Sequence, residues 1–437
     1  MKNLFGWQTE QNGEKAFELF DQIVKEGNKE NKEKLRISLF LLGRCYANGD
    51  GTEKNLQKAI ENYERAIELG DVCSVINLAL IYHYGDEEEG IKVNLQKATV
   101  LYEKAIEMGN SNGIYNLALI YQYGDEEEAV KRNIKRAIEL YEKSVQMGNT
   151  NAMFNLALFY ESGDEKEGIQ KNLHKTIELY QKSIELGNPV SLFRLALIYQ
   201  SGSEEEDIKK DLQKSISLYE KAAQFGNASA IYNLALIFRD GDEEAGIKRD
   251  LHKAIELFQV AVQFGERSAM NDLALIFQHG DEEEGVEKDI NKAIELFTIA
   301  SEFGNTLAMY NLALIYQFQG EKEGIKRDTR KAIELYEKSI EMGNFNSMFN
   351  LALIYEYGDQ EEGIERDLQK AIHLYQKSIE LGKPKAMFKL ALLYQDGDEK
   401  GALEKDLPKA IELLQQASLL GLNEAKIHLE KLTGESK

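Results

Sequence analysis

The stretch Asn155-Leu156-Ala157-Leu158-Phe159-Tyr160 returns in slightly varied form every 39 residues along this chain of 437 residues. Its first leucine recurs without a slip in spacing at Leu78, Leu117, Leu156, Leu195, Leu234, Leu273, Leu312, Leu351 and Leu390. A period of this length indicates stacked helical units, each of which buries its apolar face only against its neighbours. We therefore expect one elongated all-α domain instead of several globular domains built around a single catalytic pocket.

The third repeat, residues 110–148, shows the plan of each unit. Asn110 caps a predicted first helix over 111–123, whose apolar residues recur at helical spacing. After a loop over 124–132, Asn133 caps a predicted second helix over 134–147, and Gly148 supplies the left-handed residue that ends it. The second-helix cap is Asn or Asp in all ten units: Asn55, Asn94, Asn133, Asn172, Asp211, Asp250, Asp289, Asp328, Asp367 and Asp406.

The first repeat carries a specific motif, which reads Gly49-Asp50-Gly51-Thr52-Glu53-Lys54-Asn55, followed by Lys58-Ala59, Tyr63, Arg65-Ala66 and Gly70. This pattern resembles that of the Sel-1-like repeats, a branch of the tetratricopeptide-like helical repeats, and the likeness covers nearly the whole chain. The resemblance implies a right-handed α/α superhelical solenoid that acts as a non-enzymatic scaffold or adaptor for a partner protein. We expect an N-terminal capping helix over 1–34, ten repeats over 35–422 (the first of about 36 residues, the rest of 39), and a capping half-repeat with a tail over 423–437.

Every repeat after the first has four residues, instead of the family's one, between the two glycine positions of its loop. These nine inserts hold 28 carboxylates and three lysines, whereas the whole chain has a net charge of −22, so the remainder is slightly positive. Because packed helices lie about 8–10 Å apart, the inserts should align as an acidic ridge that attracts a basic partner. The alternative is that the ridge only maintains solubility. The ridge residues are Asp86, Glu87, Asp125, Glu126, Asp164, Asp242, Asp281, Glu282 and Asp359.

The first helices offer a second candidate surface, because in this family they usually line the concave side. The residue before the core leucine is Asn in six of nine repeats, and Arg194, Asp272 and Lys389 break the series. Amide side chains can pair with the backbone of an extended peptide, and leucine and aromatic rows can contact its side chains. The alternative is that these rows are inter-repeat core. The predicted concave groove comprises Asn77, Asn116, Asn155, Asn233, Asn311, Asn350, Leu119, Leu158, Leu236 and Leu314.

No catalytic chemistry is indicated by the sequence. The six histidines are scattered over different repeats, the two cysteines, Cys45 and Cys73, form no metal-binding motif, and no nucleophile or phosphate-binding motif occurs. The acidic inserts lack the alternating ligand spacing of a calcium loop. We therefore predict no enzymatic activity, no cofactor and no metal.

Location and partners follow from composition. No apolar run is long enough to span a bilayer, and the first residues lack the apolar core of a secretory signal, so a cytoplasmic protein is expected. The strong acidity argues against nucleic acid and membranes as partners and favours a protein or peptide, which the ridge would select for basic character. We expect a monomer. A regulatory or activator subunit of an enzyme complex, and a polyanionic ridge that binds a basic partner, remain alternative functions.

Overall fold

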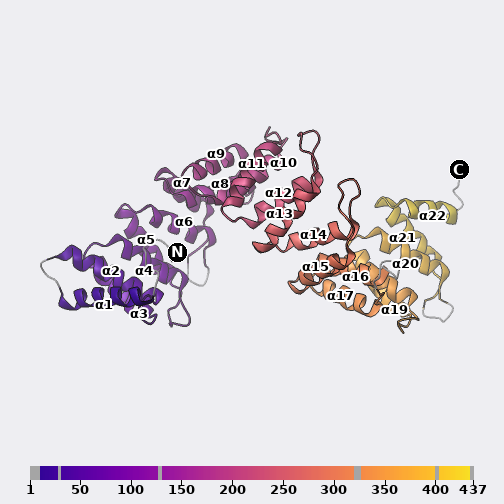
Figure 1. Cartoon of the computed structure of the whole chain (residues 1–437), viewed down its shortest axis with the longest axis horizontal. Helices are drawn as coiled ribbons and strands as arrows, with labels where there is room; N and C mark the ends of the chain where they lie inside the picture. Colours follow the sequence, from indigo (N-terminus) through magenta and orange to yellow (C-terminus); the bar gives the residue numbers. More distant parts are fainter. Residues whose placement is uncertain (1–9, 28–30, 126–129, 319–325, 399–402, 434–437) are drawn as a thin grey trace. The chain divides into compact units, whose positions relative to one another are not determined.

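The computed structural model describes residues 10–27, 31–125, 130–318, 326–398 and 403–433. In these ranges the regular secondary structure consists of 22 α-helices, which Figure 1 shows in chain order. The chain divides into two compact units, unit 1 over 1–222 and unit 2 over 223–437, and each is described by itself.

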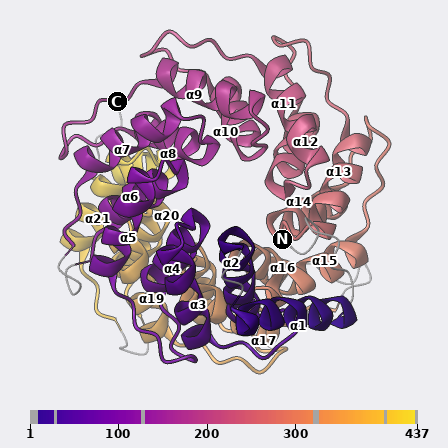
Figure 2. The same ribbon diagram turned by 90° about the vertical axis from the view of Figure 1, so that its left-hand side faces the viewer.

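Unit 1 contains a leading helix and five helix pairs, and Figure 2 shows the first helices of these pairs on the inner side of a curved row. The first helices are α2 (Lys32–Asn48), α4 (Val72–Tyr84), α6 (Ser111–Tyr123), α8 (Thr150–Ser162) and α10 (Val190–Ser201). The leading helix and the second helices are α1 (Glu10–Glu26), α3 (Leu56–Glu68), α5 (Leu95–Glu107), α7 (Ile134–Gln146), α9 (Leu173–Glu185) and α11 (Leu212–Gln224), whose last two residues fall beyond the boundary.

Unit 2 repeats the arrangement, with α12, α14 and α16 inside α13 and α15 (Figure 2). Its first helices are α12 (Ala228–Asp240), α14 (Ser268–His279), α16 (Thr306–Phe318), α18 (Ser347–Tyr357), α20 (Pro384–Asp396) and α22 (Asn423–Thr433). Its second helices are α13 (Leu251–Gln263), α15 (Ile290–Glu302), α17 (Thr329–Glu341), α19 (Leu368–Glu380) and α21 (Leu407–Leu419).

Local capping fixes where the helices begin and end. Each of the ten predicted Asn and Asp residues accepts a hydrogen bond from the backbone N–H three residues on, which satisfies an otherwise unpaired donor of the second helix. Gly148 ends α7 at φ +83°, a left-handed conformation that glycine adopts without strain. The helices predicted for the third repeat are therefore confirmed, except that Met147 is the C-cap of the second.

The entry into the first full repeat differs from expectation. The first full repeat was expected from residue 35, but α2 already begins at Lys32, in the polar stretch before it. The side chain of Asn31 accepts a hydrogen bond from the Lys34 backbone N–H at 3.0 Å, and this cap extends the helix through the polar stretch.

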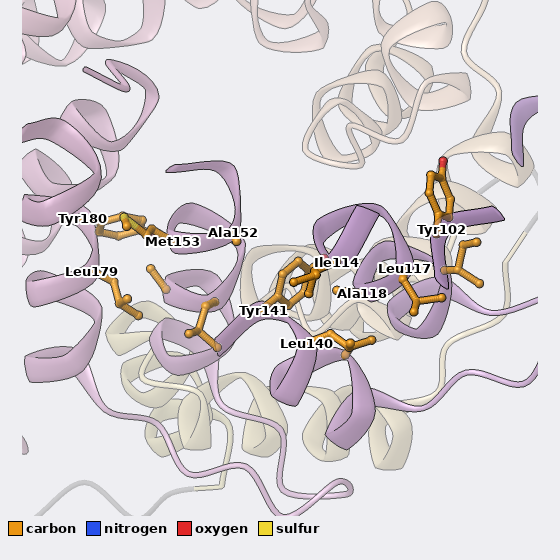
Figure 3. Close-up of a cluster of buried hydrophobic side chains, with 14 of the residues drawn as sticks. Tyr102, Ile114, Leu117, Ala118, Leu140, Tyr141, Ala152, Met153, Leu179 and Tyr180 are labelled. Atoms are coloured by element: carbon orange, nitrogen blue, oxygen red, sulfur yellow. The ribbon is translucent and has the colours of Figure 1, made fainter. Parts of the chain in front are cut away.

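The core runs between consecutive helices within each unit. Figure 3 shows Tyr102, Tyr141 and Tyr180, from α5, α7 and α9, packed among leucines, alanines and Met153 of the neighbouring helices. All three rings are fully buried, as are Phe258 and Phe297 at the same position in unit 2. Burial of large side chains at every repeat supplies the main stabilising free energy, since each removes apolar surface from water. The second-helix tyrosines are therefore packing residues.

Candidate functional site

The predicted groove residues lie on the inner first helices of the two units (Figure 2). Asn116 and Asn350 are buried, and the other four asparagines of the row are half-buried. The four predicted leucines, Leu119, Leu158, Leu236 and Leu314, are also half-buried, so each has one side in the core and one side towards solvent. The leucine row therefore contributes both to the core and to the surface on which the groove was predicted.

The amide nitrogens of this row are already used within the chain. In α8 the Asn155 amide donates to the hydroxyls of Tyr115 and Tyr141, both at 3.3 Å. In unit 2 Asn350 donates to Tyr310 at 3.2 Å. The remaining donors are Asn77, Asn116 and Asn233, which bond a carbonyl of their own helix, and Asn311, which bonds Asn271. The side-chain nitrogens of all six asparagines are therefore engaged within the chain.

The residues that break the asparagine series are each paired with the preceding first helix. Arg194 lies 3.5 Å from Glu161, and Lys389 lies 3.8 Å from Glu356. The third exception, Asp272, lies 3.5 Å from Arg239, with the charges reversed. The residue 33 positions earlier is a neutral glutamine in four of the six repeats that keep the Asn, namely Gln122, Gln200, Gln278 and Gln317, and it is Arg44 before Asn77 and His83 before Asn116. The exceptions are thus matched pairs between consecutive repeats.

The residue on the preceding first helix, such as Gln122 or Glu161, also accepts a hydrogen bond from a buried tyrosine. The Tyr141 hydroxyl donates to Gln122 at 2.6 Å, and the Tyr180 hydroxyl donates to Glu161 at 2.6 Å. Burial raises the pKa of both tyrosines well above the ordinary value, so the phenols remain protonated donors. Sequence reasoning missed this network, although the co-occurrence of Glu161 with Arg194 was a readable signal.

Large aromatic side chains stand exposed at the end of four first helices. Tyr84 and Tyr123 in unit 1 are 66% and 71% exposed, and Phe318 and Tyr357 in unit 2 are both 64% exposed. They occupy one position of the repeat, which is directly before the loop glycine for the three tyrosines and before Gln319 for Phe318. Sequence analysis did not single them out, because the position holds Ser, Asp or His in the other repeats.

The acidic inserts turn out to connect consecutive repeats. The first acid of an insert is held by a cation of the preceding loop, as in Asp86 with Lys54 at 2.6 Å and Asp281 with Arg249 at 2.7 Å. Its other oxygen accepts a backbone N–H of the insert, from Glu284 at 2.9 Å in the case of Asp281. The Lys54 ammonium and the Glu89 N–H lower the pKa of Asp86, since both stabilise the charged carboxylate.

The fourth acid caps the preceding second helix. Glu89 accepts the backbone N–H of Leu56 at 3.1 Å, and Glu206 accepts that of Leu173 at 2.5 Å. A carboxylate at a helix N-terminus is stabilised by unpaired N–H groups and by the helix dipole. Two of the four insert positions therefore serve the stacking of repeats.

The two middle positions of each described insert are exposed. Of the predicted ridge residues, Glu87 and Glu282 are in this class, Asp86, Asp125, Asp164, Asp242, Asp281 and Asp359 are half-buried first acids, and Glu126 lies outside the described residues. The charge available to a partner is thus smaller than the sequence count suggested, and it lies at the tips of the loops.

Hollows occur elsewhere on the surface. One of about 890 Å³ lies at the loop edge of unit 2 and is lined by Tyr316, Arg327 and Arg330. Another, of about 470 Å³, lies beside Tyr82 and Val100 of unit 1.

Within the described ranges, no three His, Cys, Asp or Glu side chains come together as a possible metal site. Both cysteines are free, and burial raises the pKa of Cys45 to about 11, so its thiol stays protonated near neutral pH. Among the described helices, none combines the length and apolar character needed to cross a membrane.

Comparison with known proteins agrees with this architecture. The family model of the Sel1 repeat matches residues 3–28, 37–71, 74–110, 111–149, 150–188, 189–227, 228–263, 267–305, 306–344, 346–383 and 384–422. Because these segments make up most of the sequence, the chain belongs to the Sel1 repeat family. Proteins of this family share a repeat scaffold that typically mediates protein–protein interaction.

Solved structures show the same fold. The chain is similar to c5321, a protective antigen of uropathogenic Escherichia coli with an SLR fold, at 25% identity and a TM-score of 0.67, over 97% of this chain and 84% of that one. It is also similar to a Sel1 repeat protein from Oxalobacter formigenes, at 21% identity and a TM-score of 0.55, over 77% of this chain and 89% of that one. A search of the curated proteins finds no match.

Proposed function

We propose that this chain is a non-enzymatic scaffold that holds an extended segment of a partner protein along the inner first helices. The observation that carries the proposal is the recurring row of Asn and Leu residues, in which Asn77, Asn155, Asn233, Asn311 and the four leucines are half-buried. The carbonyl oxygens of these four asparagines would accept N–H groups of the partner's backbone, and the exposed sides of the leucines would contact its side chains.

Photo-crosslinking in the native cytoplasm tests this assignment by position. A benzophenone amino acid is placed at Asn112 or Asn151, which are exposed at the start of α6 and α8, and for comparison at Val100, which is exposed on the second helix α5. The proposal expects one protein to be crosslinked from both inner positions and not from Val100. Crosslinks from Val100 alone would place binding on the outer side and contradict it.

The acidic ridge remains the second candidate surface, with a basic partner. Its exposed middle acids, such as Glu87 and Glu282, favour that reading, but first acids such as Asp281 are tied to the preceding repeat. Binding through the loop tips alone would weaken steeply as salt rises, because exposed charges are screened within about 8 Å at physiological ionic strength. Binding through the inner row would persist.

A further inference from the structure

Tyr357 is the exposed tyrosine near the end of unit 2, and its contacts show which kind of side chain this position of the repeat can bind. The Lys389 ammonium donates to the Tyr357 hydroxyl at 2.8 Å and lies 5.1 Å from the centre of the ring. Glu356 stands 3.8 Å from the same ammonium. A cation is attracted to the face of an aromatic ring and to a carboxylate, so these side chains together form a seat for a lysine. In unit 2 this seat is occupied by Lys389 itself, which lies on the next first helix, α20.

Unit 1 has the same aromatic position without the lysine, and the position of Glu356 holds His83 before Tyr84 and Gln122 before Tyr123. The residue that corresponds to Lys389, 32 positions after the tyrosine, is Asn116 for Tyr84 and Asn155 for Tyr123. Asn116 donates to a carbonyl of its own helix at 2.9 Å, and Asn155 donates to two other tyrosines. Among the described residues, no lysine or arginine lies over either ring. Among the described residues both rings of unit 1 are thus exposed without a cation beside them, whereas Tyr357 in unit 2 has Lys389.

The surroundings of Tyr84 are complementary to a cation as well. One face of Tyr84 stacks on His83 with ring centres 4.5 Å apart, so its orientation is supported while 66% of the residue stays exposed. The exposed acids Glu87 and Glu88 lie three and four residues further on in the loop. Cation–ring contacts also recur inside the fold, as with Lys175 at 4.0 Å from the Tyr160 ring centre.

We propose that Tyr84 and Tyr123 seat two basic side chains of an extended partner segment that crosses the first helices of unit 1. This inference rests on the proposed function and names the chemical class of the partner. Because α5 packs against both α4 and α6, the two tyrosines should be at least as far apart as packed helices, about 8–10 Å, and residues three apart in a polyproline II segment span about 9 Å. The two Lys or Arg residues should therefore be at least three positions apart.

Selection of short random peptides on the full-length chain provides the probe, and the affinity of the best synthetic peptide is then measured. The inference expects selected peptides to carry two basic residues at least three positions apart. Replacing each lysine of the best peptide by norleucine should weaken binding about tenfold, since the aliphatic stem is kept and the charge is lost.

Two variants of the chain test the seat without changing its net charge. Tyr84→Leu with Tyr123→Leu removes the rings and should also weaken binding about tenfold, whereas non-specific attraction by the acidic chain would be unchanged. His83→Glu with Asn116→Lys recreates the Glu356 and Lys389 arrangement and should fill the Tyr84 seat from within. Thermal melting of each variant confirms that it folds.

The outcomes separate this inference from the function on which it rests. Peptides that bind the inner row without basic residues, or that bind both variants as tightly as the wild type, would overturn the inference and leave the scaffold function standing. If selection yields no peptide that binds the chain, both are contradicted. Loss of binding in both variants together with the norleucine effect would support both.

Discussion

The guanidinium of Arg239 lies 3.5 Å from the carboxylate of Asp272 on the next first helix of unit 2. The Tyr232 hydroxyl donates to the same carboxylate at 2.6 Å. Glu161 and Arg194 occupy these two positions in unit 1 with the charges exchanged. Since the Asp272 side chain is only 14% exposed, an unmatched charge there would be costly, and we infer that such pairs make consecutive repeats specific for each other.

Reversing one charge should therefore destabilise unit 2, and reversing both should restore part of the loss. We expect Asp272→Arg to lower the free energy of unfolding by about 1–3 kcal/mol, because two guanidinium groups would then face each other. The double variant with Arg239→Glu recreates the order seen at Glu161 and Arg194. A double-mutant cycle from chemical denaturation should give a coupling of at least about 1 kcal/mol. Simple additivity would show that the residues do not interact.

Supplying a missing hydroxyl should stabilise the fold. The Gln278 Oε1 atom is buried and has no hydrogen-bond partner, because Phe297 stands where Tyr141 reaches Gln122 in unit 1. Phe297→Tyr is expected to raise the free energy of unfolding by about 1 kcal/mol. Phe258→Tyr is the matched control, because the side chain at its partner position is Arg239, which cannot accept. Phe258→Tyr should not raise the free energy of unfolding. An equal rise in both variants would contradict the role given to Gln278.

A strained loop residue offers a second route to stabilisation. Asp207 adopts φ +53°, at the loop position that is glycine in Gly168 and Gly246. Residues with a Cβ atom are strained there, so Asp207→Gly should increase stability by about 0.5–1 kcal/mol, and the reverse change Gly246→Asp should reduce it by a similar amount. Thermal melting measures both. A fall in melting temperature for Asp207→Gly would mean that its side chain stabilises the loop.

The insert contacts predict a specific pH dependence. The Glu284 N–H and the Arg249 guanidinium lower the pKa of Asp281 from its ordinary value of 3.8. A lowered folded-state pKa stabilises the fold above the unfolded-state pKa, and that contribution disappears as pH falls through the folded-state value. Asp281→Asn should therefore melt below the wild type at pH 6, with the difference shrinking below about pH 4. Glu282→Gln, at an exposed position, should show no such difference.

The repeat made most of the fold readable from sequence. The period of Leu156 and its equivalents, the caps such as Asn133 and the glycines such as Gly148 each follow from local chemistry, and the structure agrees with them. The contacts between repeats were not readable to the same degree. Arg194, Asp272 and Lys389 looked like irregularities because each is explained only by a residue on the preceding helix, about 33 positions earlier.

The contacts of the inserts with the preceding repeat were not predicted, for a related reason. In a run such as Asp86-Glu87-Glu88-Glu89 all residues have the same charge, so composition alone does not show that the first and fourth point to the preceding repeat. The two middle ones point to solvent. The assignments of the groove and ridge as binding surfaces stay predictions.

Hydrogen–deuterium exchange of the full chain, with and without the protein crosslinked from Asn112 and Asn151, tests the central claim most directly. If the inner first helices hold the partner, exchange should slow in α6 and α8 and in their equivalents, while α5, α7 and the inserts exchange as before. Slower exchange confined to the second helices or to the acidic loops would contradict the account and move the binding surface to those elements.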